Sequence, residues 1–191
     1  MRTLIAVIAC LFVLASAPAR AQQQPQLDPE NTIYLDVGNA KETYGRVVIK
    51  LRPDLAPNHV ARIKELTRQN FYDGIYFHRV IAGFMAQTGD PRGTGEGGSK
   101  LPNLKSEFTD TPHYRGVVSM ARAEGEDSAN SQFFIMLNDN MDLNGRYTVW
   151  GEVVSGIQYV DRIKLGDPKN NGAVTNPDRI VRMRVAADVK N

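Results

Sequence analysis

Short apolar stretches rich in β-branched and aromatic residues recur along most of this chain, and glycine, proline, asparagine or aspartate separates them. The stretches TIYLDV (32–37) and RVVIKL (46–51) flank a Gly/Asn-containing connection, which predicts an opening β-hairpin. Further strands are predicted within residues 75–81, 84–89, 116–121, 131–137, 147–154 and 179–187. Strand-sized runs at this spacing favour an antiparallel sandwich or barrel over alternating βαβ units.

Two segments show a different, helical pattern. Within residues 59–70 the side chains of Val60, Ile63 and Leu66 recur at helical spacing, and Pro57 stands where a first-turn proline is tolerated. We therefore predict an amphipathic helix whose three apolar side chains face the core. A second, short helix is predicted within residues 156–165.

The first 21 residues have the order of a secretory signal peptide. Arg2 precedes an apolar run from Leu4 to Leu14, and small residues follow up to Ala21, where we predict cleavage. The apolar run is too short for a comfortable membrane span, and an uncleaved anchor is the alternative. Residues 22–30 are polar and contain proline, which predicts a flexible segment before a domain covering residues 31–191.

Composition limits the remaining possibilities. A chain of 191 residues, 42% of them hydrophobic, can build one substantial core but has little room for two domains. The signal segment contains two of the 23 basic residues and no acidic one, which leaves 21 charges of each sign and gives no indication of nucleic-acid or membrane binding. The only cysteine, Cys10, also lies in that segment, so the processed chain would form no internal disulfide. We expect a monomer that is not inserted in the membrane once the signal is removed, in the periplasm or secreted.

Polar residues inside the predicted strands suggest a site. Strand alternation places Arg79 on the face opposite His78. By the same rule, the two members of each of the following pairs lie on the same face of their strand: Met85 with Gln87, Gln132 with Phe134, and Phe133 with Ile135. One face can then enter the core, where we also expect Trp150, while the other offers a mixed surface. Because an unpaired charge is very costly to bury, Arg79 needs a partner or a ligand there.

Three long segments carry a resemblance to a known family. FHRVIAGFMAQTGDPRGTGEGG, VVSMARAEGEDSANSQFFIML and NGRYTVWGEVVSGIQYVDRI closely resemble the cyclophilin family of peptidyl-prolyl cis-trans isomerases, from about Thr32 to about Ala187. The resemblance implies a closed eight-stranded antiparallel β-barrel capped by two α-helices, with the active groove on its outside. It also implies that Arg79 is the principal catalytic residue. The implied substrate-binding residues are Phe84, Met85, Phe134, Leu143 and Tyr147 in and around a proline pocket, and Gln87, Ala121, Arg122, Ala123 and Gln132 in a polar groove.

The implied reaction is consistent with these residue types. Rotation about an X-Pro bond must cross a barrier of about 18–20 kcal/mol because amide resonance is lost in the twisted state. In that state the prolyl nitrogen regains a lone pair, and a fixed guanidinium donor would stabilise it more than the planar ground state. The reaction needs no nucleophile, metal or cofactor. The expected partners are proline-containing peptides and folding exported proteins, with a peptide-binding chaperone or scaffold as the rival hypothesis.

Other patterns have a simpler interpretation. Residues 93–98 satisfy G-x-G-x-x-G but lead to no helix, so we expect a glycine-rich loop near the groove and no nucleotide. No metal-ligand spacing relates the three histidines, and His78 is interpreted as a hydrogen-bonded structural residue. The serines that could suggest a hydrolase, Ser119, Ser128 and Ser131, stand in no G-x-S-x-G elbow.

Three positions depart from the family pattern. Asp142 stands where many members have tryptophan, which argues against tight binding of cyclosporin-like macrocycles. Arg122 replaces a common asparagine and adds a positive charge beside the groove, while Tyr147 replaces a common histidine.

Overall fold

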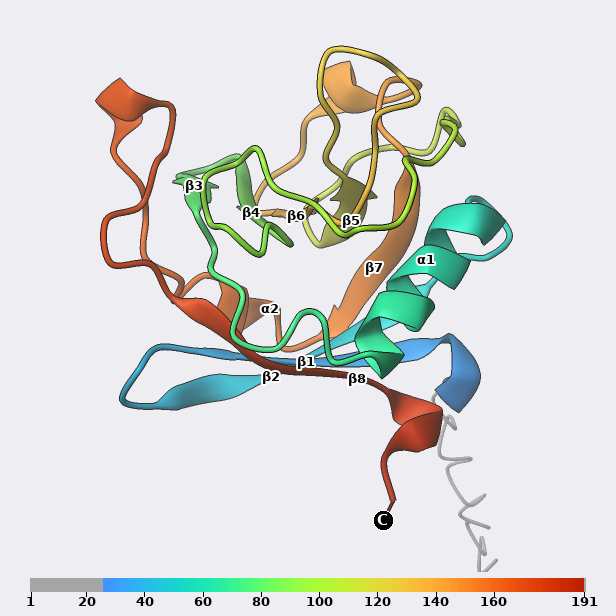
Figure 1. Cartoon of the computed structure of the whole chain (residues 1–191), viewed down its shortest axis with the longest axis horizontal. Helices are drawn as coiled ribbons and strands as arrows, with labels where there is room; N and C mark the ends of the chain where they lie inside the picture. Colours follow the sequence, from blue (N-terminus) through green and yellow to red (C-terminus); the bar gives the residue numbers. More distant parts are fainter. Residues whose placement is uncertain (1–25, 191) are drawn as a thin grey trace, which may run out of the picture.

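Eight antiparallel strands form one strongly curved sheet in the computed structural model, which describes residues 26–190 (Figure 1). The strands are β1 (Thr32–Gly38), β2 (Thr43–Leu51), β3 (Arg79–Ile81), β4 (Met85–Thr88), β5 (Val117–Met120), β6 (Phe133–Met136), β7 (Val149–Ser155) and β8 (Arg179–Val185). Their order across the sheet is β3-β4-β6-β5-β7-β2-β1-β8. Each predicted stretch overlaps one of these strands, although β2 begins three residues earlier than predicted. The predicted hairpin is β1–β2, in which Thr32 lies opposite Lys50.

The sheet is an open half-barrel, so the predicted closed barrel is wrong on this point. β3 and β8 are the two ends of the strand order, and no ladder joins them within the described residues. Only the segment before β3 meets the start of β8, through the isolated bridge Tyr76↔Arg179 and a 2.8 Å hydrogen bond from Phe77 N to Asp178 O. A continuous ladder does not form because β3 has only three residues and, on the edge away from β4, bonds to the loop of residues 166–174. Within that loop Gly172, at φ 77°, accepts a hydrogen bond from Val80 N and turns the chain away.

Within residues 26–190, two α-helices accompany the sheet, as predicted. α1 (Pro57–Arg68) packs against β7 and β8, whereas α2 (Ile157–Val160) is a single turn inside the longer predicted segment. Four 3₁₀ turns complete the structure: η1 (Pro29–Asn31), η2 (Met141–Leu143), η3 (Pro168–Asn170) and η4 (Ala186–Asp188). No helix within residues 26–190 has the length and apolar character that crossing a bilayer requires.

The start of α1 lacks a side-chain cap of its own, and a distant carboxylate supplies one. Ala56 is the N-cap residue and offers no side-chain acceptor. Glu107 accepts hydrogen bonds from Asn58 N at 3.1 Å and His59 N at 3.0 Å, which satisfies two amides that the first turn leaves free. The loop that carries Glu107 is thereby tied to the helix.

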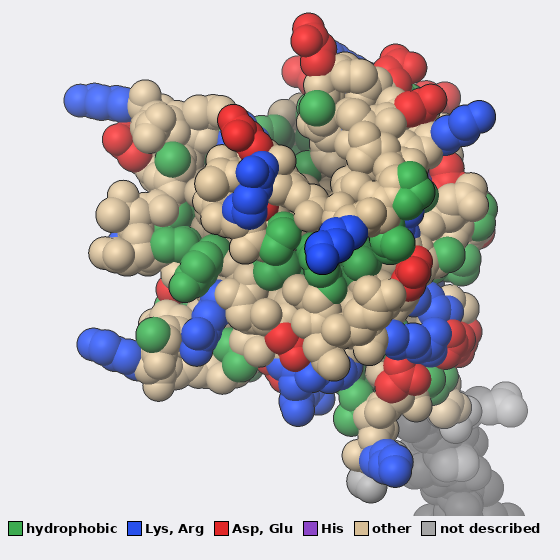
Figure 2. Space-filling view, in the orientation of Figure 1, with side chains coloured by type: hydrophobic (Ala, Val, Ile, Leu, Met, Phe, Trp, Pro, Cys, Tyr) green, Lys and Arg blue, Asp and Glu red, His purple; other side chains and the backbone are tan. Residues whose placement is uncertain are grey.

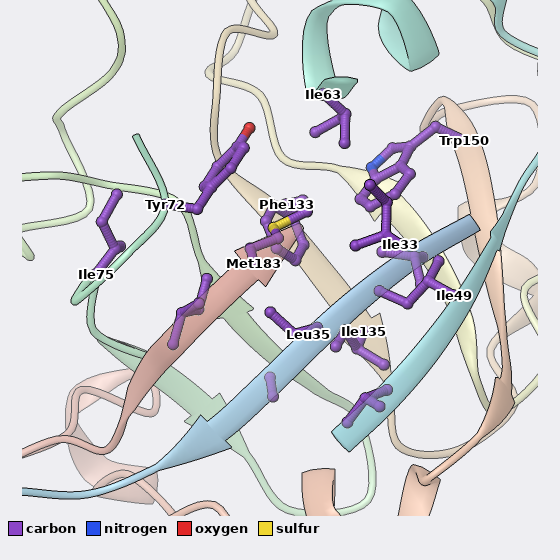
Figure 3. Close-up of a cluster of buried hydrophobic side chains, with 14 of the residues drawn as sticks. Ile33, Leu35, Ile49, Ile63, Tyr72, Ile75, Phe133, Ile135, Trp150 and Met183 are labelled. Carbon is purple, nitrogen blue, oxygen red and sulfur yellow. The ribbon is translucent and has the colours of Figure 1, made fainter. Parts of the chain in front are cut away.

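The main hydrophobic core fills the concave side of the sheet, where strands far apart in the order converge (Figure 3). Ile33 and Leu35 of β1 meet Phe133 and Ile135 of β6, and the rings of Phe133 and Trp150 pack edge to face with centroids 5.3 Å apart. The predicted core residues are all buried here: Val60, Ile63, Leu66, Phe133, Ile135 and Trp150.

A smaller apolar cluster lies on the opposite face of the same strands. It contains Met85 of β4, Phe134 and Met136 of β6, and partly buried side chains that include Phe84 and Leu143. Successive residues of β6 alternate between the two clusters, which confirms the predicted facing of Phe133 and Phe134. The second cluster forms the floor of the candidate site.

The predicted signal peptide, including Cys10, lies outside the described residues, as do residues 22–25 of the N-terminal segment. The described end of that segment carries η1, where Glu30 accepts hydrogen bonds from Arg68 of α1. Basic and acidic side chains are interspersed over the face seen in Figure 2, in keeping with the balanced charge of residues 22–191.

Candidate active site

Two adjoining cavities open over the smaller apolar cluster. The larger has a volume of about 650 Å³ and the smaller about 380 Å³, and both are bordered by Gln87, Ala121 and Arg122. Of the predicted site residues, the larger cavity is lined by Arg79, Phe84, Met85, Gln87, Ala121, Arg122, Phe134, Leu143 and Tyr147. The smaller cavity adds Ala123 and Gln132. The structure thus brings every predicted site residue to the wall of one continuous groove.

One end of the larger cavity is an apolar pocket. Phe84 and Met85 come from the turn into β4, and Phe134 comes from the neighbouring strand β6. Leu143 reaches the pocket from η2, and the Tyr147 ring packs edge to face on Phe134 with centroids 5.5 Å apart. Flat aromatic walls and flexible thioethers suit a compact saturated ring.

Arg79 stands beside this pocket and is held on two sides. Its Nη1 donates to Gln87 Oε1 at 3.0 Å across the β3–β4 pair. On the other side Nε donates to Asn171 O and Nη2 to Asn171 Oδ1, both at 3.0 Å. No carboxylate of residues 26–190 pairs with Arg79, and although burial lowers the pKa of the guanidinium, an arginine stays charged in proteins. The site therefore contains a fixed cation whose charge no described side chain neutralises.

A chain of hydrogen bonds continues from Arg79 into the groove. Gln87 Nε2 donates to Gln132 Oε1 at 2.9 Å. Gln132 Nε2 then donates to the carbonyl oxygens of Gly95 and Gly97 at 2.9 and 2.8 Å. Every member donates in the same direction, so one network fixes the orientation of both amide side chains.

Residues 90–98, the glycine loop, form a wall of both cavities. The loop is wound around Asp90, whose carboxylate accepts hydrogen bonds from the backbone N–H groups of Arg92, Thr94 and Gly95 at 2.7–2.9 Å. Burial alone would raise the pKa of Asp90, but these backbone donors lower it below its usual value. Because the amides donate to Asp90, they are not free to hold a phosphate in the manner of a nucleotide-binding loop.

His78 is buried, as a structural histidine would be, but the predicted hydrogen bonding of its ring is wrong. The side chain is only 8% exposed, and neither ring nitrogen has a hydrogen-bond partner among the described residues. Gly95 of the glycine loop lies against the ring, but its N–H already donates to Asp90 and its carbonyl oxygen accepts from Gln132. Burial lowers the pKa of His78, with the charge of Asp90 opposing, so the ring is neutral at neutral pH.

The serines do not form a usable hydrolytic site. Ser119 Oγ lies 2.9 Å from Nε2 of His113, and the other ring nitrogen lies 3.1 Å from Asn144 Oδ1. Ser119 and His113 are both fully buried, so no substrate reaches the pair. Instead His113 supports the pocket, since its ring stacks behind Phe134 with centroids 6.5 Å apart.

Several lining residues were not predicted from the sequence. Asn171 and its neighbours Asn170, Ala173 and Val174 line the cavity that Arg79 and the glycine-loop residues Gly93 to Glu96 also line. Asn171 is 92 positions from Arg79 in the chain, and the only sequence signal is a loop rich in Asn and Gly. Within residues 26–190, no three His, Cys, Asp or Glu side chains gather as a metal site would require.

The combination of an open eight-stranded half-barrel, an apolar pocket and an adjacent fixed arginine defines a family. Residues 34–185 match the family model described as cyclophilin type peptidyl-prolyl cis-trans isomerase/CLD, and the chain belongs to this family of isomerases.

Individual proteins of similar sequence or structure agree with this family assignment. A probable peptidyl-prolyl cis-trans isomerase of Brucella suis is 49% identical over 97% of both chains. Peptidyl-prolyl cis-trans isomerase B of Bacillus subtilis is 42% identical over 66% of this chain and 88% of its own. Among solved structures, the cyclophilin AquaCyp293 from Hirschia baltica superposes with a TM-score of 0.75 at 28% identity, covering 86% of this chain and 77% of its own. A cyclophilin-type isomerase of Cryptosporidium parvum, solved in the presence of the dipeptide Ala-Pro, has a TM-score of 0.72 at 24% identity, covering 84% and 99%.

Proposed function

We propose that this isomerase accelerates X-Pro rotation in exported proteins, with Arg79 as its catalytic residue. The proline ring would occupy the pocket of Phe84, Met85, Phe134 and Leu143, and the guanidinium would donate to the prolyl nitrogen as the bond twists. A cyclophilin-type isomerase of the same fold from Cryptosporidium parvum was solved in the presence of the dipeptide Ala-Pro, which supports a proline-containing ligand.

The observation that carries the proposal is the fixation of Arg79 beside the pocket. A guanidinium has five N–H donors, and Asn171 and Gln87 engage three of them. Two donors remain for a substrate, on a group that cannot swing away. A preorganised donor stabilises developing electron density without reorganisation during the reaction.

The place of action follows from the first 21 residues. Their signal-peptide pattern supports export, which would leave the domain in the periplasm or outside the cell. Isomerisation of X-Pro bonds takes tens of seconds or more without a catalyst and can limit the folding of newly exported chains. The reaction consumes no nucleotide, which suits a compartment outside the cytoplasm.

The test compares wild type with Arg79→Ala on a short X-Pro peptide, using NMR exchange for the rate and NMR titration for binding. We expect the rate of the bound peptide to fall about 10²–10³-fold, the range for removal of one preorganised donor, with much smaller loss of binding. Arg182→Ala, on the outer side of β8, is the matched control and should keep the wild-type rate.

Equal losses of binding and turnover in Arg79→Ala would contradict the catalytic role. Peptide binding by wild type without any acceleration would favour the rival peptide-binding module. Cleavage of the amino-terminal segment is tested separately, by mass spectrometry of the chain recovered from a bacterial periplasm. A chain that starts at Gln22 supports the signal assignment, and an intact Met1 refutes it.

A further inference from the structure

Arg122 occupies the boundary between the two cavities. It lines both of them and follows β5 directly after Ala121, where the chain leaves the sheet. A peptide that extends from the apolar pocket into the smaller cavity must therefore pass this side chain.

The guanidinium of Arg122 is held as firmly as that of Arg79. Its Nε donates to Arg146 O at 3.1 Å, and Nη1 donates to Ala123 O at 3.1 Å and to Glu124 O at 3.0 Å. Two aromatic rings lie near it, with Cζ 5.1 Å from the centroid of Tyr147 and 5.7 Å from that of Phe108. All these contacts fix the position of the charge, and none of them neutralises it.

No carboxylate of residues 26–190 forms an ion pair with Arg122. The acidic residue that shares both cavities with it is Glu96, whose exposed carboxylate accepts no hydrogen bond from the described residues. A fixed charge discriminates between ligands more strongly than a mobile one, because less side-chain entropy is lost when the contact forms. The groove should therefore select for negative charge at Arg122 despite the nearby Glu96.

The distance to the proline pocket limits where that charge can lie in a substrate. Arg122 lies over Tyr147, and Tyr147 packs on Phe134 of the pocket at a centroid distance of 5.5 Å. An extended chain advances about 3.3–3.6 Å per residue, so the cation is within about three residues of a bound proline.

We propose that Arg122 makes this isomerase selective for substrates with an acidic side chain within three residues of the proline. The two Nη2 hydrogens, which bond to no described residue, would donate to that carboxylate. This inference depends on the proposed proline-peptide substrate but adds a specificity that the proposed function does not require. Arg122 contributes to substrate binding and not to rotation about the X-Pro bond, so its effect should be seen in the dissociation constant.

The experiment uses paired peptides that differ only in Glu or Gln at one position, scanned over the three residues on each side of the proline. Dissociation constants come from NMR titration and turnover from NMR exchange, at low and at high salt. For at least one position we expect wild type to bind the Glu peptide about 3–10-fold more tightly, between the values typical of exposed and of desolvated ion pairs. High salt should reduce this preference.

Two substitutions test whether Arg122 is the source. Arg122→Gln should bring the Glu/Gln ratio close to one, and Arg122→Lys should keep part of it, because the charge stays while the planar fork is lost. Arg146→Gln is the matched control, since it removes a neighbouring exposed charge but leaves the backbone carbonyl that accepts from Arg122. Arg146→Gln should keep the full preference.

The outcomes separate this inference from the proposed function. A Glu/Gln ratio near one at every position in wild type overturns the inference, even if every peptide is isomerised. If Arg122→Gln and Arg146→Gln reduce the preference for the Glu peptide equally, the inference is overturned as well, because the preference then comes from the general electrostatic field of the protein. A preference that depends on Arg122 in the absence of any acceleration supports the inference as a binding property while the isomerase proposal fails.

Discussion

At the scale of single residues, the site depends on how Arg79 is restrained. A free arginine side chain loses about 2 kcal/mol of rotamer entropy when it is ordered, and here the folded chain has already supplied that ordering. Asn171 contributes both a backbone and a side-chain oxygen to this end. Its backbone has φ 49°, a left-handed conformation that asparagine and glycine tolerate better than other residues.

Asn171→Gly therefore removes the side-chain acceptor without straining the backbone. We expect kcat for an X-Pro peptide to fall about 3–10-fold with little change in KM, which corresponds to the net value of about 1 kcal/mol for one hydrogen bond. Asn176→Gly is the control, because Asn176 is also left-handed at φ 53° but lines neither cavity. Similar kinetics in the two variants, or a loss confined to KM, would contradict a positioning role for Asn171.

Sequence alone could predict one side of this restraint but not the other. Arg79 and Gln87 lie on adjacent predicted strands, and alternation places both on the same face of the sheet. Asn171 comes from a loop whose course depends on the tertiary fold, and neither periodicity nor a turn pattern specifies which strand it will face. The same limit explains His78: its place directly before β3 was readable, but the glycine loop that lies against it was not.

At the scale of elements, the glycine loop shows why glycine is required at particular positions. A Cβ atom on Gly97 would lie 1.7 Å from Asp90 Oδ1, inside the carboxylate that organises the loop. A Cβ on Gly125, in the neighbouring loop, would only reach ordinary contact with Ser128 at 4.0 Å. Asp90 and Gly97 thus together fix the glycine loop, whose carbonyl oxygens accept hydrogen bonds from Gln132.

Gly97→Ala should displace the loop and weaken the hydrogen bonds to Asp90. We expect the free energy of unfolding to fall by about 1–3 kcal/mol, the cost of leaving a buried polar group poorly bonded. Peptide affinity should fall too, because Gln132 loses its acceptors at Gly95 and Gly97. Urea unfolding and NMR titration check both effects, and a loss of the same size in Gly125→Ala would show that the loop is not organised by Asp90.

The regular elements were largely predictable, and their ends and edges were less so. Alternation and helical spacing identified each strand and α1 because one face of each is buried in the core. The closure of the sheet was not readable from these patterns. It depends on how the short β3 meets the loop around Gly172, which is a matter of three-dimensional packing.

At the scale of the whole molecule, the two faces of one sheet carry two apolar clusters, and buried histidines pack in the structure that supports these clusters. Burial lowers the pKa of His78, and it lowers that of His113, which is hydrogen-bonded to Ser119. His59 is also buried, but there the nearby Glu107 opposes the lowering of its pKa. Neutral histidines are thus part of the packed structure.

Stability should therefore decrease on mild acidification. The unfolded chain binds protons at these histidines once the pH falls below about 6.5, while the folded chain resists protonation down to its lower pKa. Between these two values each such group lowers the free energy of unfolding by up to about 1.4 kcal/mol per pH unit, and above pH 7 it has no effect.

Urea unfolding at several values between pH 7.5 and pH 5 measures this slope while most carboxylates remain ionised. His113→Gln keeps hydrogen-bonding groups but cannot titrate, so its stability should depend less steeply on pH than that of wild type. If the free energy of unfolding of wild type stays constant or rises as the pH falls from 7.5 to 5, the assignment of neutral buried histidines is refuted.

The one-way hydrogen-bond chain from Arg79 through Gln87 and Gln132 has a consequence for the kind of peptide segment that suits the groove. Gln132 uses both of its side-chain N–H hydrogens on Gly95 O and Gly97 O, so the unused donors of the chain are two N–H groups of Arg79 and one of Gln87. A peptide segment normally presents one donor for each carbonyl, but proline has no N–H and leaves its segment with an excess of acceptors. Three unused N–H groups beside the apolar pocket match that excess. The groove can therefore favour proline by hydrogen-bond polarity as well as by the shape of its pocket.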